Sequence, residues 1–97
     1  MYARVTHYLV LPGKLEEFIR LIQEENIPQA KRQPGFKNSY ILTHKRIGVC
    51  VVITFWETEA ALLASEEGNI LQEQLIKVVS VLAALPNREL YEVSAQA

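Results

Sequence analysis

The chain has 97 residues, which is the size of one domain, and we expect a single domain over residues 1–97. Hydrophobic residues make up 49% of it and charged residues 22%, a composition typical of a globular protein and not of a disordered one. The formal net charge of −1 argues against nucleic-acid or anionic-membrane binding, because such surfaces need a basic excess. The longest apolar stretch, Ile47 to Trp56, is about half of the ~20 residues that a membrane-spanning helix needs.

The cysteine content and the N-terminus predict a cytoplasmic protein. Cys50 is the single cysteine, which excludes an intramolecular disulfide and a cysteine-based zinc site. The N-terminus has no apolar stretch behind a basic start, so no signal peptide is expected.

The first part of the chain predicts a strand followed by a helix. Residues 2–11 are rich in β-branched and aromatic side chains, which favours a strand, and Pro12 ends it. Apolar residues then recur at the spacing of one helical face over residues 15–22. Pro28 removes a backbone donor, so we expect it to kink or end this helix near residues 26–27.

The rest of the chain predicts two strands, a divided helix and a last strand. Residues 36–43 and 48–57 are the strands, and Thr58 can cap the helix that follows. Gly68 divides that helix into two pieces, and residues 88–94 form the last strand. The order β-α-β-β-α-β predicts an α+β, ferredoxin-like fold, with a four-stranded antiparallel sheet and two helices on one face.

The strand over residues 48–57 is apolar on both of its faces. Alternate side chains of a strand point to opposite faces, so one face carries Val49, Val51, Ile53 and Phe55, and the other carries Cys50, Val52, Thr54 and Trp56. Helices can cover only one face of the sheet, and an exposed apolar face forgoes several kcal/mol of burial energy at ~25 cal/mol per Å². We therefore expect a symmetric homodimer joined through the sheet face. The alternative is a central strand whose second face is covered by long neighbouring side chains.

Short motifs along nearly the whole chain resemble those of the antibiotic biosynthesis monooxygenase family, which forms dimeric α/β barrels. They are Leu11-Pro12-Gly13-Lys14 before Phe18, Pro34-Gly35-Phe36, Phe55-Trp56-Glu57-Thr58 with Glu59-Ala60, and Tyr91-Glu92-Val93. The resemblance implies a barrel closed between two protomers. It also implies oxygenation of anthrones, quinols or related phenols without metal, flavin or other cofactor.

Other members of that family degrade haem with an Asn on the first strand and a Trp and a His on the second helix. This chain has Thr6, Ser65 and Leu75 at those positions, which disfavours haem degradation.

A cofactor-free oxygenase needs a group that removes a proton from a bound phenol or enol. His7 is our first candidate for this base, because the pKa of histidine lies near neutrality. The simpler interpretation is that His7 forms a hydrogen bond in the core or at an interface. His44 lies in a polar connection and is expected to be solvated.

Several other residues are candidates for contact with the substrate. Tyr8 and Tyr40, and also Tyr91, can donate hydrogen bonds to a phenolate, although packing with the hydroxyl at the edge is the simpler interpretation of each. Trp56 can line the pocket or anchor the junction between strand and helix. Arg4 can hold an anionic substrate or pair with a carboxylate such as Glu89 or Glu92.

The resemblance therefore implies a cofactor-independent monooxygenase acting on a small aromatic molecule. Two alternatives stay open: a dimeric protein that binds a small apolar ligand without catalysis, and an isomerase or lyase on the same scaffold. No phosphate-binding loop, metal-ligand cluster or Ser-His-Asp pattern is found.

Overall fold

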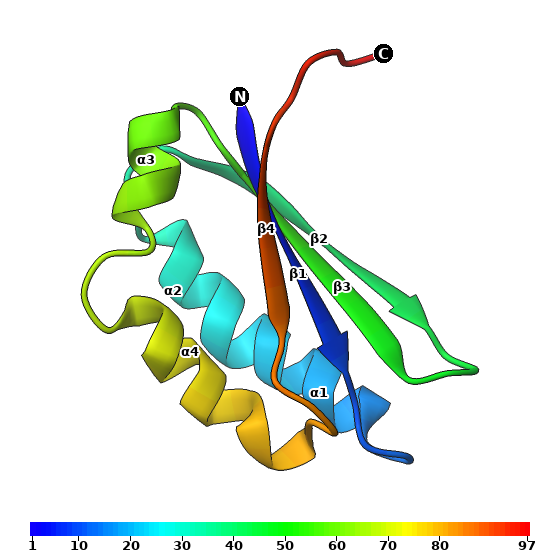
Figure 1. Cartoon of the computed structure of the whole chain (residues 1–97). Helices are drawn as coiled ribbons and strands as arrows, with labels where there is room; N and C mark the ends of the chain where they lie inside the picture. Colours follow the sequence, from blue (N-terminus) through cyan, green and yellow to red (C-terminus); the bar gives the residue numbers. More distant parts are fainter.

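The computed structural model describes all of residues 1–97 and has a sheet covered by helices on one face (Figure 1). The elements are β1 (Tyr2–Leu9), α1 (Leu15–Leu21), the π-helical η1 (Ile22–Asn26), α2 (Ile27–Lys31), β2 (Phe36–His44), β3 (Val49–Trp56), α3 (Glu59–Ala64), α4 (Ile70–Val78), the 3₁₀ segment η2 (Val79–Val81) and β4 (Asn87–Glu92). The strands lie in the order β2-β3-β1-β4, and every neighbouring pair is antiparallel. This arrangement confirms the predicted α+β, ferredoxin-like fold. No helix is long and apolar enough to cross a membrane.

The first helical region continues past the proline that was expected to interrupt it. α1, η1 and α2 follow one another without a break from Leu15 to Lys31, so an end at residues 26–27 is not observed. Pro28 lies in the first turn of α2, where its missing N–H costs little. The helix changes type immediately before it, because η1 is a π-helix.

The second helical region begins and divides as predicted. The side-chain hydroxyl of Thr58 accepts a hydrogen bond from the backbone N–H of Ala61 at 3.0 Å, which caps α3. Gly68 lies between α3 and α4 with a φ of +63°, a conformation that favours glycine. The first strand is shorter than expected, since Val10 beyond Leu9 forms only an isolated bridge to Leu82.

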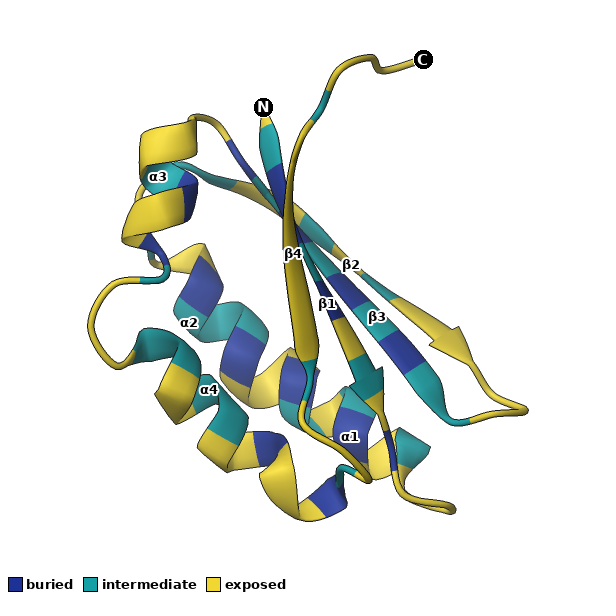
Figure 2. Ribbon diagram, viewed as in Figure 1, coloured by how far each residue is buried: buried dark blue, intermediate teal, exposed yellow.

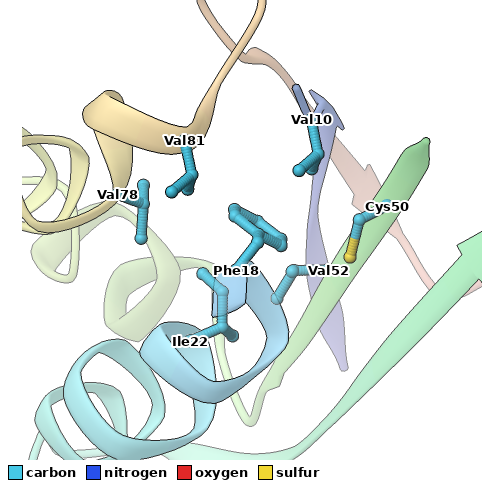
Figure 3. Packing of buried hydrophobic residues seen from close by; sticks show 7 residues of the cluster. All are labelled: Val10, Phe18, Ile22, Cys50, Val52, Val78 and Val81. Atoms are coloured by element: carbon cyan, nitrogen blue, oxygen red, sulfur yellow. The ribbon is translucent and has the colours of Figure 1, made fainter. Parts of the chain in front are cut away.

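The hydrophobic core fills the space between the sheet and the helices (Figure 3). Phe18 and Ile22 from the first helical region pack there against side chains of β3 and of the segment after α4. The buried cluster comprises Val10, Phe18, Ile22, Cys50, Val52, Val78 and Val81. The sheet face that carries this core is called the helix-facing face below.

The opposite face of the sheet, called the outer face below, is apolar but uncovered in the single chain. Val49, Val51, Ile53 and Phe55 on β3 are only partly buried, whereas the alternate residues of β3 are buried. The strands beside them leave large apolar side chains exposed on this face, and these are Leu9, Tyr40, Leu42 and Tyr91. In Figure 2 the colour of β3 alternates between buried and intermediate, whereas β4 has the exposed colour along its length.

Candidate functional site

A cavity of about 350 Å³ lies between the helix-facing side of the sheet and the helices. Its volume is near the lower end of the ~300–1,000 Å³ that ligand pockets occupy, so it suits a small molecule. The sheet supplies polar side chains from β1, β3 and β4, and the helices supply most of the apolar side chains together with the polar Asn26, Gln72 and Gln74. The residues used below are Arg4, Thr6, Tyr8, Ile27, Glu66, Leu71, Leu75 and Arg88.

Arg4 is the buried cation of this cavity, with only 4% of its surface exposed. Its Nη1 donates a hydrogen bond to Ser65 Oγ at 2.6 Å and lies 3.7 Å from Glu66 Oε2. Its guanidinium carbon lies 5.6 Å from the centroid of the Trp56 ring, a cation–π distance. Burial lowers the pKa of Arg4 and the nearby Glu66 carboxylate partly offsets this, so the side chain stays charged. Neither Glu89 nor Glu92, the two partners suggested by the sequence, pairs with it.

Tyr8 lies on the same face of β1 as Arg4, four residues further along the strand. Its ring packs on Phe18 with a centroid distance of 4.8 Å. Burial raises the pKa of Tyr8 to about 12, although the positive charges of Arg4 and Arg88 act in the opposite direction. The phenol is therefore neutral near pH 7 and can donate a hydrogen bond into the cavity.

Arg88 brings a second guanidinium to the same cavity from the edge strand β4. It lies beside Thr6 in the pairing of β1 with β4, so its side chain shares the helix-facing face with Arg4 and Tyr8. No carboxylate lies within ion-pair distance of it. The cavity wall thus holds two cations and one carboxylate, Glu66.

The structure separates the predicted site residues into two groups on opposite sheet faces. Arg4 and Tyr8 line the cavity, whereas His7 and Tyr40 lie on the outer face. The His7 side chain is 44% exposed, and its Nε2 lies 3.2 Å from Glu89 Oε1. Tyr40 is 55% exposed, and its ring meets the edge of Phe55.

Trp56 is fully buried behind the polar wall and is not among the residues that line the cavity. Its Nε1 donates a hydrogen bond to Thr54 Oγ1 at 3.0 Å, and its ring packs edge-on against Phe36. The ring also stands against the Arg4 guanidinium, so Trp56 holds a cavity residue in place without touching the cavity itself.

Sequence reasoning missed Asn26, Glu66 and Arg88. Asn26 is 94% buried, and it occupies the next position of the apolar helical face, four residues after Ile22. A polar residue at such a position was the signal that could have drawn attention to it. Its Nδ2 donates to the backbone carbonyl of Gln74 at 3.4 Å, and its Oδ1 has no hydrogen-bond partner.

Glu66 gave a weaker signal, because it stands beside Glu67 in a polar segment typical of a solvated surface. Arg88 gave none, since a basic residue at the start of an edge strand is ordinary. No three His, Cys, Asp or Glu side chains are grouped closely enough to hold a metal ion.

The chain is a small α+β domain with a cavity between its sheet and its helices. Residues 1–73 match the sequence pattern of the antibiotic biosynthesis monooxygenase family, and the chain belongs to that family. No curated protein is similar enough in sequence to count as a match.

Solved structures with this fold cover nearly the whole chain. A candidate antibiotic biosynthesis monooxygenase from Nitrosomonas europaea is 21% identical, with a TM-score of 0.79 over 98% of this chain and 100% of that one. A second, from Caulobacter crescentus, is 18% identical, with a TM-score of 0.78 over 97% of this chain and 90% of that one. SnoaB, a cofactor-independent oxygenase from Streptomyces nogalater, is 14% identical, with a TM-score of 0.78 over 98% of this chain and 95% of that one. At these identities the likeness shows the shared fold.

Proposed function

We propose that this protein oxygenates a small hydroxylated aromatic molecule of the anthrone, quinol or phenol type without a cofactor. The observation that carries the proposal is the cavity, whose apolar helix wall faces Arg4, Tyr8 and Arg88. An aromatic ring fits the apolar wall, and an oxygen that becomes negative during reaction fits the polar wall. The fold shared with SnoaB, a cofactor-independent oxygenase, supports the same reaction class by analogy.

The proposed chemistry converts a ring CH₂ into a carbonyl. Removal of one proton gives an enolate, which the charges of Arg4 and Arg88 and the hydroxyl of Tyr8 stabilise. Dioxygen accepts electrons from the enolate carbon and forms a peroxide on it. Loss of water breaks the O–O bond and takes the second ring hydrogen, so one oxygen atom stays on the ring and the other leaves as water.

Glu66 is our choice as proton acceptor, since it is the one carboxylate on the cavity wall. His7 remains the alternative base, and it would require the substrate to bind at the outer face of the sheet.

Oxygen uptake with a dihydroxyanthrone tests the function and separates these two bases. We expect one dioxygen consumed per anthrone, a roughly 100-fold lower kcat in Tyr8→Phe, and a similar loss in Glu66→Gln. His7→Ala is the matched control on the other side of β1 and should keep the wild-type kcat. A loss in His7→Ala with full activity in Glu66→Gln would move the reaction to the outer face.

The same assay distinguishes the other two functions that the sequence leaves open. Turnover that persists without oxygen would indicate an isomerase or lyase. Saturable binding with no turnover would indicate a ligand-binding protein.

We also propose that a second copy of the chain covers the outer face. Support comes from the outer-face residues of β3, which are only partly buried, and from the exposed side chains of Leu9, Tyr40 and Leu42 on the neighbouring strands. Glu89 on the edge strand β4 pairs with His7 on β1, whereas the outer-face residues of β3 are all apolar, so this part of the face can be desolvated at little electrostatic cost. An uncovered apolar face favours burial against a second copy, and two-fold dimers are the commonest assemblies.

A further inference from the structure

We propose that the ligand is an aromatic molecule that carries a carboxylate, and that this carboxylate replaces Glu66 on the guanidinium of Arg4. The inference rests on the proposed function, because it specifies the substrate of the same cavity. It assigns Arg4 and Arg88 as specificity-determining residues and gives Glu66 two states.

The first argument is the unused hydrogen-bonding capacity of Arg4. A guanidinium has five N–H donors in a planar fork that matches a carboxylate. In this structure only Nη1 makes a hydrogen bond, to Ser65 Oγ, while Nε and Nη2 make none. Arg4 is nevertheless 96% buried and lines the cavity. Nε and Nη2 are not among the buried atoms that lack a partner, so they are accessible at the cavity that Arg4 lines, and an acceptor from outside the chain can reach them there.

The second argument is the weakness of the contact between Arg4 and Glu66. The two charged groups are 3.7 Å apart, longer than the ~2.7–2.9 Å of a charge-assisted hydrogen bond. Glu66 lies in the connection between α3 and α4, two residues before Gly68, and its side chain is 23% exposed. Its side chain can therefore rotate away from Arg4 at little cost and still face the cavity that it lines. A ligand carboxylate with two short hydrogen bonds to the fork would displace it.

The third argument is the charge balance of the cavity wall. Arg4 and Arg88 contribute two positive charges, and Glu66 contributes one negative charge. A carboxylate on the ligand neutralises the remaining charge, whereas an uncharged ligand leaves one cation without a counter-charge in a partly desolvated site. The apolar side chains of Leu71 and Leu75 line the same cavity and can contact the ring of the ligand.

The displacement has a consequence for the proposed chemistry. A carboxylate without a guanidinium partner, and beside a second carboxylate, accepts a proton more readily. The ligand that takes the Arg4 fork would thus leave Glu66 free to act as the proton acceptor. An aromatic without a carboxylate would leave Glu66 paired with Arg4 and so react more slowly.

Calorimetric titration with naphthoate and its uncharged analogue naphthamide tests the inference without any turnover. We expect the wild type to bind naphthoate at least tenfold more tightly than naphthamide, as one charge-assisted hydrogen bond predicts. Arg88→Gln should weaken naphthoate binding about tenfold and leave naphthamide unchanged. Glu66→Gln should strengthen naphthoate binding, because the competing carboxylate is gone. Arg46→Gln, which removes the same charge from an exposed turn, is the matched control and should change neither.

Arg4→Lys keeps the charge of the buried residue but loses the fork, so it should weaken naphthoate binding while a folded circular-dichroism spectrum is retained. Equal affinity for the two probes in the wild type would overturn the inference, as would weaker naphthoate binding in Glu66→Gln. Because Arg88 is exposed, its variant keeps the test decisive even if Arg4→Lys fails to fold.

The binding experiment and the oxygen-uptake assay can fail independently, so they distinguish this inference from the proposed function. Charge-dependent naphthoate binding with no oxygen uptake from any hydroxylated aromatic carboxylate would refute the oxygenase and keep the inference. Oxygen uptake that proceeds equally well with carboxylated and uncharged anthrones would keep the oxygenase and refute the inference.

Discussion

The two faces of the sheet have similar side chains on β3 but very different surroundings. On the helix-facing face, Cys50, Val52 and Trp56 are buried by the helices of the same chain. On the outer face, Val51 and Ile53 are only partly covered, and Leu42 beside them is 51% exposed. The polar groups that can do chemistry, Arg4 and Tyr8 among them, also lie on the helix-facing side. The difference is that the cavity and the buried core lie on one face, while the other face leaves apolar side chains uncovered in the single chain.

Truncating a core side chain on the helix-facing side should have the largest effect on stability. Phe18 is fully buried and packs on Tyr8 in the core cluster that contains Val52 of β3, so Phe18→Ala should lower the free energy of unfolding by about 3–5 kcal/mol. Tyr40→Ala removes a ring of similar size from the outer face. In urea titrations at a protein concentration that keeps the chain monomeric, it should cost far less. Equal losses in the two variants would mean that the outer face is already packed within one chain.

A charge placed on the outer face should break the dimer without unfolding the chain. Leu42→Glu puts a carboxylate opposite Val51, and a two-fold interface would bury it twice. We expect the dimer dissociation constant to rise about 100-fold or more, measured by sedimentation as a shift from twice 11.0 kDa to 11.0 kDa.

Ile76→Glu is the matched control for this substitution. Ile76 is 66% exposed on α4, on the other side of the molecule from the outer face, so its variant should remain as dimeric as the wild type. A wild-type chain that is monomeric at micromolar concentration would refute the dimer itself.

The fold could be predicted from the sequence because its signals are local. Period-two strands, an apolar helical face, the Thr58 cap and the break at Gly68 each specify one element, and the order of elements specifies the topology. The helix around Pro28 was predicted less well. The chain forms the π-helical η1 just before the proline, and no residue pattern predicts this change of helix type.

The site was predicted only in part because it depends on which face of β1 the helices cover. Alternation places His7 and Tyr8 on opposite faces but does not say which face is covered, and both carry apolar neighbours. Ser65 bonds Arg4 although the two are 61 residues apart in the sequence, and the adjacent Glu66 also lies beside Arg4. The position of α3 creates both contacts. Such long-range polar pairs follow from packing and not from local pattern.

The reactivity of a thiol should distinguish the two faces next. Cys50 is fully buried on the helix-facing side, and burial raises the pKa of its thiol to about 11. At pH 8 it should therefore react with a disulfide reagent only as fast as the protein opens. Val51→Cys in a Cys50→Ala background moves the thiol by one residue to the outer face. It should react rapidly in dilute protein and more slowly as dimer forms, and rapid labelling of wild-type Cys50 would show that the core is open.

The smallest expected effect is the dependence of stability on alkaline pH through the same thiol. The folded pKa of Cys50, about 11, lies above the ordinary value of 9.0, so the folded chain holds this proton more tightly than the unfolded chain does. The stabilising contribution is complete below pH 9 and is lost as the pH rises towards 11. Tyr8, whose pKa is raised to about 12, adds a similar loss at slightly higher pH, which the Cys50→Ala variant retains. Urea unfolding of wild type and Cys50→Ala at pH 8 and pH 11 should thus show a larger drop for the wild type. A parallel drop in the two proteins would mean that Cys50 reaches solvent, and with it that the helix-facing side is not the closed face of the sheet.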